Sequence, residues 1–367
     1  MGPLSGLKIL EFEAIGPGPF CGMMLADMGA DVLLVDRPAD PRLGLGRDRW
    51  FDVMMRGRRS ATLDLKSKDG AAAALELAGK ADAVIEGFRP GVMERLGLGP
   101  DVLLKRNPRL VYGRMTGWGQ EGPLAQAAGH DINYIALTGA LAGIGPADRP
   151  PPPPLNLIGD YGGGALYLAL GVAMALYERE RSGKGQVIDA AMVDGAASLM
   201  SFFYGMAAHN PNLVKREFGA LSGAQHYYRC YECADGRYIA VGAIEPQFRA
   251  ELIERLGLPQ DAAEAGDPAQ WPDKIDALAQ VFRRKTRDEW RAVLEGTDAC
   301  FAPVMEIAEA PEHPHMRARA SFIEVDGVVQ PAPAPRFSRT PGRVQGPAPA
   351  VGEGGAERLR AWGVETG

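Results

Sequence analysis

Two segments of the sequence hold residue types that could move protons at a carbon atom. One is Gly-His-Asp-Ile-Asn-Tyr with His130, and histidine is the side chain best suited to exchange protons near neutral pH. The other holds Asp160 shortly before a run of glycines, whose backbone can approach an anionic intermediate closely. Each has a structural alternative, because His130 could cap or pack a helix and Asp160 could be an N-cap. Either segment alone leaves both interpretations open.

Other charged residues lie near the ends of predicted strands. Guanidinium and ammonium groups there can hold phosphates, although solvated surface is the usual role of any single one. Glu245 follows a predicted strand and precedes a helix, which is typical of a helix N-terminal acid. The phosphate candidates are Arg37, Lys66, Arg89 and Arg95.

The first strand-turn-helix-strand segment has only part of a dinucleotide-binding pattern. Gly16 and Gly18 lie in the turn, and Asp36 ends the second strand. The third glycine is replaced by Cys21, and two prolines stiffen the turn. The pattern therefore disfavours NAD but keeps a helix N-terminus at the sheet as a place for a ligand.

Metal binding is also disfavoured. Cys230 and Cys233 lie three apart in a predicted strand, where side chains point to opposite faces, and no second pair accompanies them. His313 and His315 lack further ligands nearby. We expect no metal site.

The elements that must position these residues alternate between strands and helices. This rhythm predicts a parallel sheet covered by helices. A proline run at 150–154 predicts a stiff loop that leads into the Asp160 segment. The predicted strands are 7–13, 31–36, 83–86, 110–115 and 187–190, and the predicted helices end at 28 or span 70–79, 164–181 and 193–208.

The pattern changes after a linker-like stretch at 210–223. Segments 225–233 and 237–241 flank Ala-Asp-Gly, which predicts a hairpin. Helices are expected at 246–256, 273–284, 287–294 and 356–362, with an extended Pro-rich stretch at 330–351. We predict a large α/β domain from 1–190 with 335–367, a linker helix at 191–222, a small α+β domain at 223–328 and a return linker at 329–334.

The chain has 367 residues, 46% of them hydrophobic, and a net charge of −6. This composition supports two packed cores and argues against nucleic acid or an anionic membrane as the main partner. The apolar stretch 161–177 is short for a bilayer span and predicts a buried helix. The absence of a secretion signal and the four cysteines fit a reducing cytoplasm.

Several long motifs occur in an order that resembles the α-methylacyl-CoA racemases of the family III CoA-transferase superfamily. The motifs are GHDINY, PPLNLIGDYGGG, GKGQVIDAAMVDG, AVGAIEPQF and PAPRFSRTPG, and the resemblance covers nearly the whole chain. It implies a large Rossmann-like parallel-sheet domain and a smaller α+β domain, in an obligate interlocked homodimer. The active site would lie between the large domain of one subunit and the small domain of the other.

The resemblance also implies residue roles. His130 and Asp160 match the two acid/base residues, and Glu245 matches the acid that pairs with the histidine. The implied contacts to CoA are Arg37, Leu63, Asp64, Leu65, Lys66, Gly87, Phe88, Arg89, Arg95, Gly129, Asp131, Ile132, Asn133 and Tyr134.

The expected reaction is epimerisation at C2 of 2-methylacyl-CoA thioesters by 1,1-proton transfer through an enolate. It requires two proton-transfer groups on opposite faces of the carbon and no redox or metal cofactor, since CoA is part of the substrate. The alternative is a CoA-transferase in which Asp160 attacks the thioester. A non-catalytic CoA-binding protein would have no need of His130, Asp160 and Glu245 together.

Overall fold

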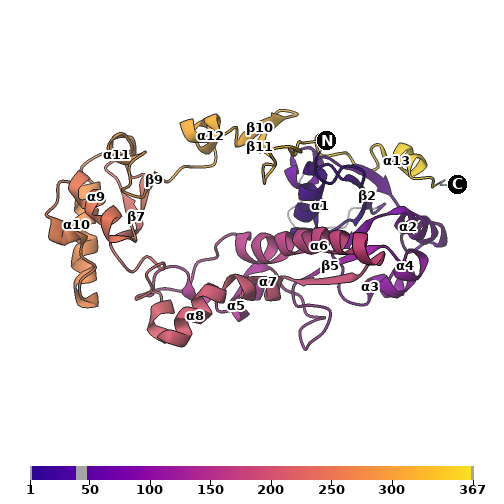
Figure 1. Ribbon diagram of the computed structural model, residues 1–367, viewed down its shortest axis with the longest axis horizontal. Helices are drawn as coiled ribbons and strands as arrows, with labels where there is room; N and C mark the ends of the chain where they lie inside the picture. Colours follow the sequence, from indigo (N-terminus) through magenta and orange to yellow (C-terminus); the bar gives the residue numbers. More distant parts are fainter. Residues whose placement is uncertain (1, 39–47, 365–367) are drawn as a thin grey trace. The chain divides into compact units, whose positions relative to one another are not determined.

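The computed structural model describes residues 2–38 and 48–364, which form two compact units (Figure 1). Unit 1 comprises Met1–Thr138, Leu155–Leu199 and His315–Gly367, and unit 2 comprises Gly139–Pro154 and Met200–Pro314. The division differs from the predicted domain ranges in three places. Residues 139–154 belong to unit 2, residues 315–334 belong to unit 1, and the predicted linker helix 191–222 is divided between the units after Leu199.

Unit 1 is built on a six-stranded parallel sheet with the order β3-β2-β1-β4-β5-β6. The strand order reverses between β1 and β4, and such a switch point is where open parallel sheets bind ligands. The strands are β1 (Lys8–Phe12), β2 (Asp31–Asp36), β3 (Arg59–Thr62), β4 (Ala83–Glu86), β5 (Val111–Thr116) and β6 (Val187–Ala191). The predicted α/β fold class is confirmed.

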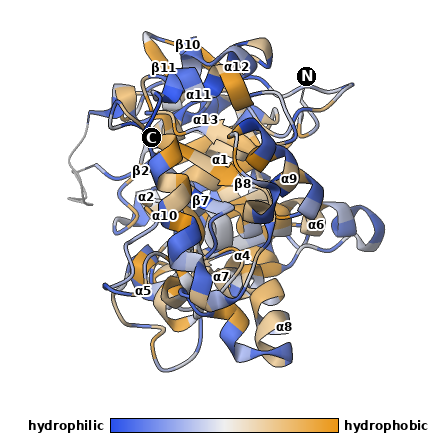
Figure 2. Cartoon of the chain, turned by 90° about the vertical axis from the view of Figure 1, so that its left-hand side faces the viewer, coloured by the Kyte–Doolittle hydropathy of each residue, from blue (hydrophilic) through white to orange (hydrophobic). Residues whose placement is uncertain are grey.

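Helices cover both faces of this sheet, so its inner strands are buried on two sides and read as continuous apolar runs. On one face Ile9 and Ile85 pack with residues of α1 (Pro17–Asp27) and α6 (Leu166–Ser182). On the other, Leu10 and Tyr112 pack with residues of α2 (Lys68–Lys80), α4 (Pro100–Arg106) and α13 (Gly355–Ala361). Helix α1 and strand β2 are predominantly hydrophobic in Figure 2.

The remaining elements of unit 1 are short. A π-helix, Leu157–Ala165, runs directly into α6. The others are α3 (Val92–Arg95), α5 (Asp131–Leu137), α7 (Met192–Leu199) and the hairpin of β10 (Phe322–Val325) with β11 (Val328–Pro331), while α12 (Pro314–Ala318) lies at the boundary of the units.

Three local features differ from the sequence expectation. Strand β3 has the polar sequence Arg-Ser-Ala-Thr and lies at the edge of the sheet, so it carried no apolar run to predict it. The long helix expected from residue 164 begins earlier, in the π-helix. The helix expected at 193–208 is divided at Met200 into α7 and α8 (Ser201–His209).

Unit 2 contains a three-stranded antiparallel sheet of β7 (Tyr228–Glu232), β8 (Tyr238–Gly242) and β9 (Phe301–Pro303). The predicted hairpin is present as β7 and β8. One face of the sheet packs against α9 (Pro246–Arg255), α10 (Trp271–Phe282) and α11 (Arg287–Leu294) around Tyr231, Ile239 and Trp290. Helix α10 carries both hydrophobic and hydrophilic residues (Figure 2), as expected for a helix with one buried side.

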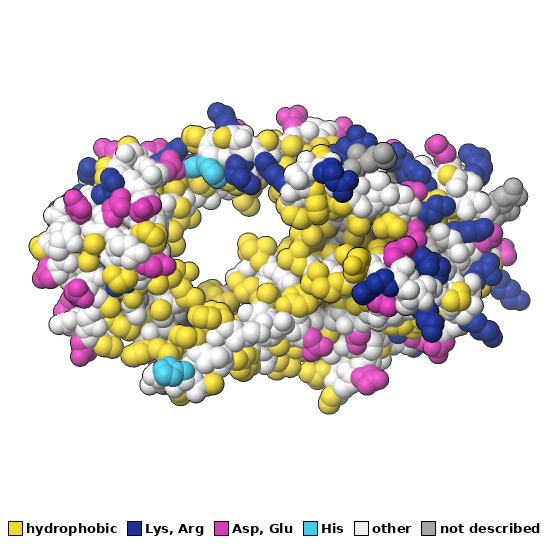
Figure 3. All heavy atoms as spheres, viewed as in Figure 1, with side chains coloured by type: hydrophobic (Ala, Val, Ile, Leu, Met, Phe, Trp, Pro, Cys, Tyr) yellow, Lys and Arg dark blue, Asp and Glu magenta, His cyan; other side chains and the backbone are white. Residues whose placement is uncertain are grey.

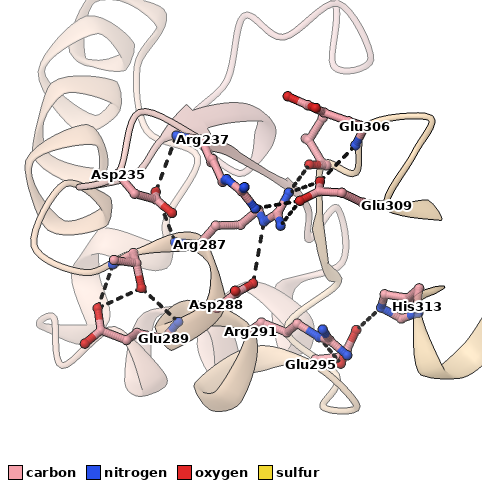
Figure 4. A network of polar contacts seen from close by, with 12 residues as sticks. Asp235, Arg237, Arg287, Asp288, Glu289, Arg291, Glu295, Glu306, Glu309 and His313 are labelled. Atoms are coloured by element: carbon pink, nitrogen blue, oxygen red, sulfur yellow. Dashed lines mark hydrogen bonds and ion pairs between the residues drawn. The ribbon is translucent and has the colours of Figure 1, made fainter. Parts of the chain in front are cut away.

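A polar network fixes the segment that follows β9 (Figure 4). The buried Arg287 donates two hydrogen bonds to Glu309, at 2.7 and 2.9 Å, and a third to the Val304 carbonyl at 3.0 Å. Farther along, His313 Nε2 lies 2.6 Å from a carboxylate oxygen of Glu295. These contacts tie residues 304–313 to helix α11.

One side of α6 presents apolar residues to solvent. The exposed fractions of Leu170, Met174 and Tyr177 are 51%, 60% and 69%, whereas Leu168 and Val172 are fully buried against the sheet. Hydrophobic side chains gather over α6 and α7 in Figure 3. The continuous helical stretch Leu157–Ser182 is long and apolar enough to cross a membrane, a criterion that core helices also meet. The helix expected to be buried is therefore buried on one side only.

Candidate active site

The loops that carry most of the predicted CoA-binding residues lie at one edge of the unit 1 sheet. Arg37 follows β2, residues 63–66 follow β3, and residues 87–89 follow β4. Because the carboxyl ends of parallel strands meet at the same edge, the structure brings these loops together. The loop after β1 also reaches this edge, since a Cβ on Gly87 would lie 2.9 Å from the Cβ of Ala14.

A cation–π contact joins the loop after β2 to the loop after β4. The guanidinium of Arg37 lies over the ring of Phe88, 5.4 Å from its centroid. The Arg37 backbone N–H donates to Glu13 at 3.0 Å. Burial raises the pKa of Glu13, and the charge of Arg37 opposes that rise. Arg37 is thus held beside Phe88 with its side chain partly exposed.

The loop after β4 is anchored by a buried ionic network. Glu86 accepts a hydrogen bond from the Phe88 N–H at 2.7 Å and is paired with Arg114 at 2.9 Å. Arg114 also bonds Glu94 at 2.8 Å. Burial raises the pKa of Glu86 to about 6, against the effects of the Phe88 N–H and Arg114. This network fixes the backbone that carries Phe88 and Arg89.

The residues after β3 divide into buried and exposed positions. Leu63 is buried in the core, so its side chain does not face a ligand. Asp64 and Lys66 are exposed, and the Asp64 carboxylate accepts from the Lys66 N–H at 3.0 Å. Leu65 is partly buried against the same core. Arg95, at the end of α3, is exposed.

His130 lies at the N-terminus of α5, where its backbone is extended. Its N–H donates to the Asn133 side chain at 3.0 Å. Tyr134, one turn later, is buried edge-on against Trp118, and its hydroxyl donates to the Gly129 carbonyl. These contacts fix the backbone on both sides of His130, whose side chain is exposed in unit 1. Ile132 is 40% exposed on the same helix.

Asp160 lies in the first turn of the π-helix and is not an N-cap, which corrects the structural alternative. Its Oδ2 accepts from the Asn156 side chain at 3.0 Å, and its backbone N–H donates to Asp131 at 2.8 Å. A Cβ on Gly16, at the start of α1, would lie 3.1 Å from the Asp160 Oδ2. Gly16 has a φ of +66°, a backbone conformation that favours glycine, so it leaves room for the carboxylate.

The pKa of Asp160 depends on burial and on three neighbouring side chains, one of which is His130. Burial raises the pKa of Asp160, Asn156 lowers it, Asp131 raises it and His130 lowers it. Burial also raises the pKa of Tyr134 to about 12, with a further rise from Asp160 and a reduction from Arg89. The charges of Asp131 and His130 therefore act on Asp160, and those of Asp160, Arg89 and Asp131 act on Tyr134.

Glu245 lies in unit 2, between β8 and α9, and is exposed. Arg249, one helical turn later, donates to the Ile244 carbonyl and lies over the Tyr227 ring at 4.5 Å. The backbone before Glu245 is thus fixed locally. Its pairing with the histidine stays a prediction.

Some residues of the site were not assigned these roles from the sequence. Asn156 lies four residues before Asp160, a spacing that places two side chains on one face of a helix and could have indicated the contact. Gly16 was considered only for a dinucleotide. Glu86 had no signal, because its role depends on Arg114 in a neighbouring strand.

The structure also bears on other chemistries. Asp36, which could hold a ribose, is buried and already bonded to Arg49 at 2.5 Å and to the Ser60 hydroxyl. In residues 2–38 and 48–364 no group of three or more His, Cys, Asp or Glu side chains could hold a metal ion. The Asp160 carboxyl group and the His130 imidazole are instead suited to proton transfer, and the carboxylate is also suited to nucleophilic attack.

Comparisons with known proteins identify the family of this chain. The family described as CoA-transferase family III matches residues 4–354. The alpha-methylacyl-CoA racemase of Mus musculus is 45% identical over 98% of this chain and 93% of the relative, and that of Homo sapiens is 45% identical over 92% and 87%. The crystal structure of a CAIB/BAIF family protein from Brucella suis has a TM-score of 0.84 at 28% identity, covering 98% of this chain and 99% of that one. This chain therefore belongs to the CoA-transferase family III.

Proposed function

We propose that the protein is an α-methylacyl-CoA racemase that epimerises C2 of 2-methylacyl-CoA thioesters. The observation that supports it most is that burial raises the pKa of the Asp160 carboxyl group, on which the charge of His130 also acts. A carboxyl group whose pKa is raised is protonated more readily, so it can deliver a proton as well as take one. The similarity to two racemases at 45% identity supports the same assignment.

In the proposed reaction the active enzyme carries one proton shared between the two groups. With one epimer, neutral His130 takes the C2 proton, the electron pair moves into the thioester as an enolate, and protonated Asp160 returns a proton to the opposite face. The other epimer uses the groups in reversed roles. We expect backbone N–H groups beside these residues to stabilise the enolate oxygen, and Glu245 to orient the His130 ring.

We propose that CoA binds along the carboxyl edge of the sheet. Arg37, Lys66, Arg89 and Arg95 would hold phosphates, because guanidinium and ammonium groups form charge-assisted bonds to them. Phe88, whose ring lies beneath Arg37, would border the same site. No redox or metal cofactor is required by this chemistry.

We also propose a homodimer in the cytoplasm, without membrane or nucleic acid as partner. The exposed side of α6 supports the homodimer, because a contiguous apolar surface on a folded chain is typical of an interface. Substitution of Leu170 by Glu should shift the protein toward monomer in size-exclusion chromatography with light scattering, whereas Lys184→Glu beyond the helix should not. A wild-type monomer would contradict the proposal.

The alternative function is CoA transfer, with Asp160 as the nucleophile that forms a mixed anhydride and releases CoA. It rests on the family membership and on the carboxylate in the site.

One experiment separates the two functions. A single epimer of a 2-methylacyl-CoA is incubated in D₂O with and without an added carboxylic acid. A racemase introduces deuterium at C2 and loses optical purity without the acid, whereas a transferase moves CoA to the acid and leaves C2 unchanged. Absence of exchange over several acyl chain lengths would refute the racemase assignment.

A further inference from the structure

Asp131 connects the two elements that carry the acid/base residues. It is the first residue of α5, directly after His130, and its side chain is buried. Its Oδ2 accepts the backbone N–H of Gly159 at 2.6 Å and that of Asp160 at 2.8 Å. One carboxylate therefore joins the start of α5 to the first turn of the π-helix.

These two hydrogen bonds are strong enough to hold the start of α5 at a fixed distance from the first turn of the π-helix. Hydrogen bonds to an ionised carboxylate are shorter and about twice as strong as neutral ones. The Asp131 Oδ1 is buried and has no hydrogen-bond partner among the described residues. Burial of a charge is costly without compensation, so the two N–H groups carry the stabilisation of this carboxylate.

Glycines in the π-helix leave room for this contact and for the packing on the opposite side of the helix. A Cβ at Gly159 would lie 2.7 Å from the Asp131 Oδ2, too close for any side chain. On its other side the π-helix meets α7 backbone to backbone, because a Cβ at Gly163 would lie 2.5 Å from the Ala196 nitrogen. The Asp160 backbone is thus held between α5 and α7, with Asp131 as its tie to α5.

We propose that Asp131 is a positioning residue that sets the separation and relative orientation of His130 and Asp160. Its backbone fixes His130 through their shared place in the chain, and its carboxylate fixes Asp160 through two N–H groups. This inference rests on the proposed function, in which both groups must reach one carbon. It adds a structural role to a residue expected only to contact CoA.

The charge of Asp131 has a second effect on Asp160. Among the described residues, the ionisable groups that act on the Asp160 pKa are Asp131, which raises it, and His130, which lowers it. The charge of Asp160 in turn raises the pKa of the Tyr134 phenol, and Gly16, directly before α1, lies beside the Asp160 carboxylate. Loss of the Asp131 charge should therefore lower the pKa of Asp160.

The test compares Asp131→Ala and Asp131→Asn with the wild type, measuring kcat and KM for racemisation from pH 4 to 9. Misplacement of a reacting group by about 1 Å costs about 100-fold in rate, so Asp131→Ala should lose kcat by that order while KM changes by less than about threefold. Asp131→Asn keeps an oxygen that can accept both N–H groups, so it should recover much of kcat. Its acid limb should move to lower pH.

The matched control is Asp101→Asn, an exposed acid in the first turn of α4, which should leave kcat and the pH profile unchanged. Circular dichroism establishes folding, and if Asp131→Ala is unfolded the Asn variant decides through its pH profile. Wild-type kcat in Asp131→Ala, a loss confined to KM, or an unshifted acid limb in Asp131→Asn would overturn the proposal.

The two hypotheses fail separately. If the wild type exchanges no C2 hydrogen, the proposed function is wrong, and the same variants are compared in CoA transfer to an added carboxylic acid. Asp131→Ala should still lose kcat there, because Asp160 would be the nucleophile. Unchanged transfer would overturn the role of Asp131.

Discussion

Asp160 is a carboxyl group whose neighbours act on its pKa with opposite signs. Burial and Asp131 raise the pKa, whereas the Asn156 hydrogen bond and His130 lower it. When His130 is already protonated, protonation of Asp160 as well would leave the enzyme without a base to remove the C2 proton. The acid limb of the pH–rate profile therefore reports this carboxyl group.

Substitution of Asn156 by Ala should move that acid limb to higher pH. The Asn156 amide stabilises the charged carboxylate through a 3.0 Å bond, and its loss favours the protonated form. The measurement is kcat from pH 4 to 9, with the exposed Asn212→Ala as an unrelated asparagine control. A limb that stays in place or moves to lower pH would show that the amide does not act on Asp160.

The sequence indicated His130 and Asp160 as candidate proton-transfer residues but did not indicate the contacts that hold them. His130 and Asp160 lie in segments with unusual residue types, and their shared motifs made them a pair. Asp131 and Gly159 lie 28 positions apart, and no local pattern indicates that a side chain bonds a distant backbone N–H. Such contacts depend on packing, so only the structure reveals them.

At the scale of elements, the loop after β4 depends on a network beneath it. Glu86 holds the Phe88 N–H, and Arg114 and Glu94 complete the network. Since burial raises the Glu86 pKa to about 6, its charge is lost as the pH falls through that value. The backbone that carries Arg89 should then become less ordered.

We predict that the KM for acyl-CoA rises as the pH falls below about 6 and that Glu86→Gln raises KM several-fold at pH 7.5. The glutamine cannot form the ion pair with Arg114, so its KM should lose the dependence on pH in this range, with kcat nearly unchanged. Steady-state kinetics at pH 5 to 8 tests this, with the partly exposed Glu76→Gln on α2 as control. An unchanged KM in Glu86→Gln would show that the network does not support binding.

The elements differ in how far the sequence predicts them. Strands β2 and β4 are apolar because helices cover both faces, and their bounds agree with the expected ranges. Strand β3 is polar and lies at the edge of the sheet, so its sequence has too little hydrophobic patterning to predict a strand. The π-helix was also missed, because it depends on the glycine contacts with α7.

At the scale of the whole molecule, the two units have separate cores and separate responses to pH. His226 is buried in unit 2, where its Nε2 lies 3.0 Å from the Ala262 carbonyl. Burial lowers its pKa to about 4, with a further reduction from Lys274. The folded state therefore binds this proton less readily than the unfolded state does.

The stability of unit 2 should fall between pH 6.5 and about 4, the range between the ordinary and folded pKa values of His226. A lowered histidine pKa contributes stability above the ordinary value that is lost on acidification, here about 3 kcal/mol. Hydrogen exchange of the Tyr231 and Ile239 amides measures it, and His226→Gln should flatten the dependence. The exposed His209→Gln should behave like the wild type, and equal slopes in all three proteins would contradict the assignment.

The exposed side of α6 shows that the sequence does not reveal how much of an apolar helix the folded chain covers. A continuous apolar stretch predicted a buried helix, yet the folded chain buries only the side that faces the sheet. The expectation counted hydrophobic residues without knowing how much surface one chain can cover. A second copy of the chain would account for the remaining side.

In the proposed reaction His130 and Asp160 serve opposite faces of C2, and isotope exchange in single variants tests this assignment most directly. His130→Ala and Asp160→Asn are each incubated in D₂O with each pure epimer of a 2-methylacyl-CoA, and C2 deuterium and optical purity are measured. Each variant should lose racemisation but retain exchange with one epimer, and the epimer should differ between the two variants. Exchange of the same epimer by both variants, or racemisation by either at the wild-type rate, would contradict the account.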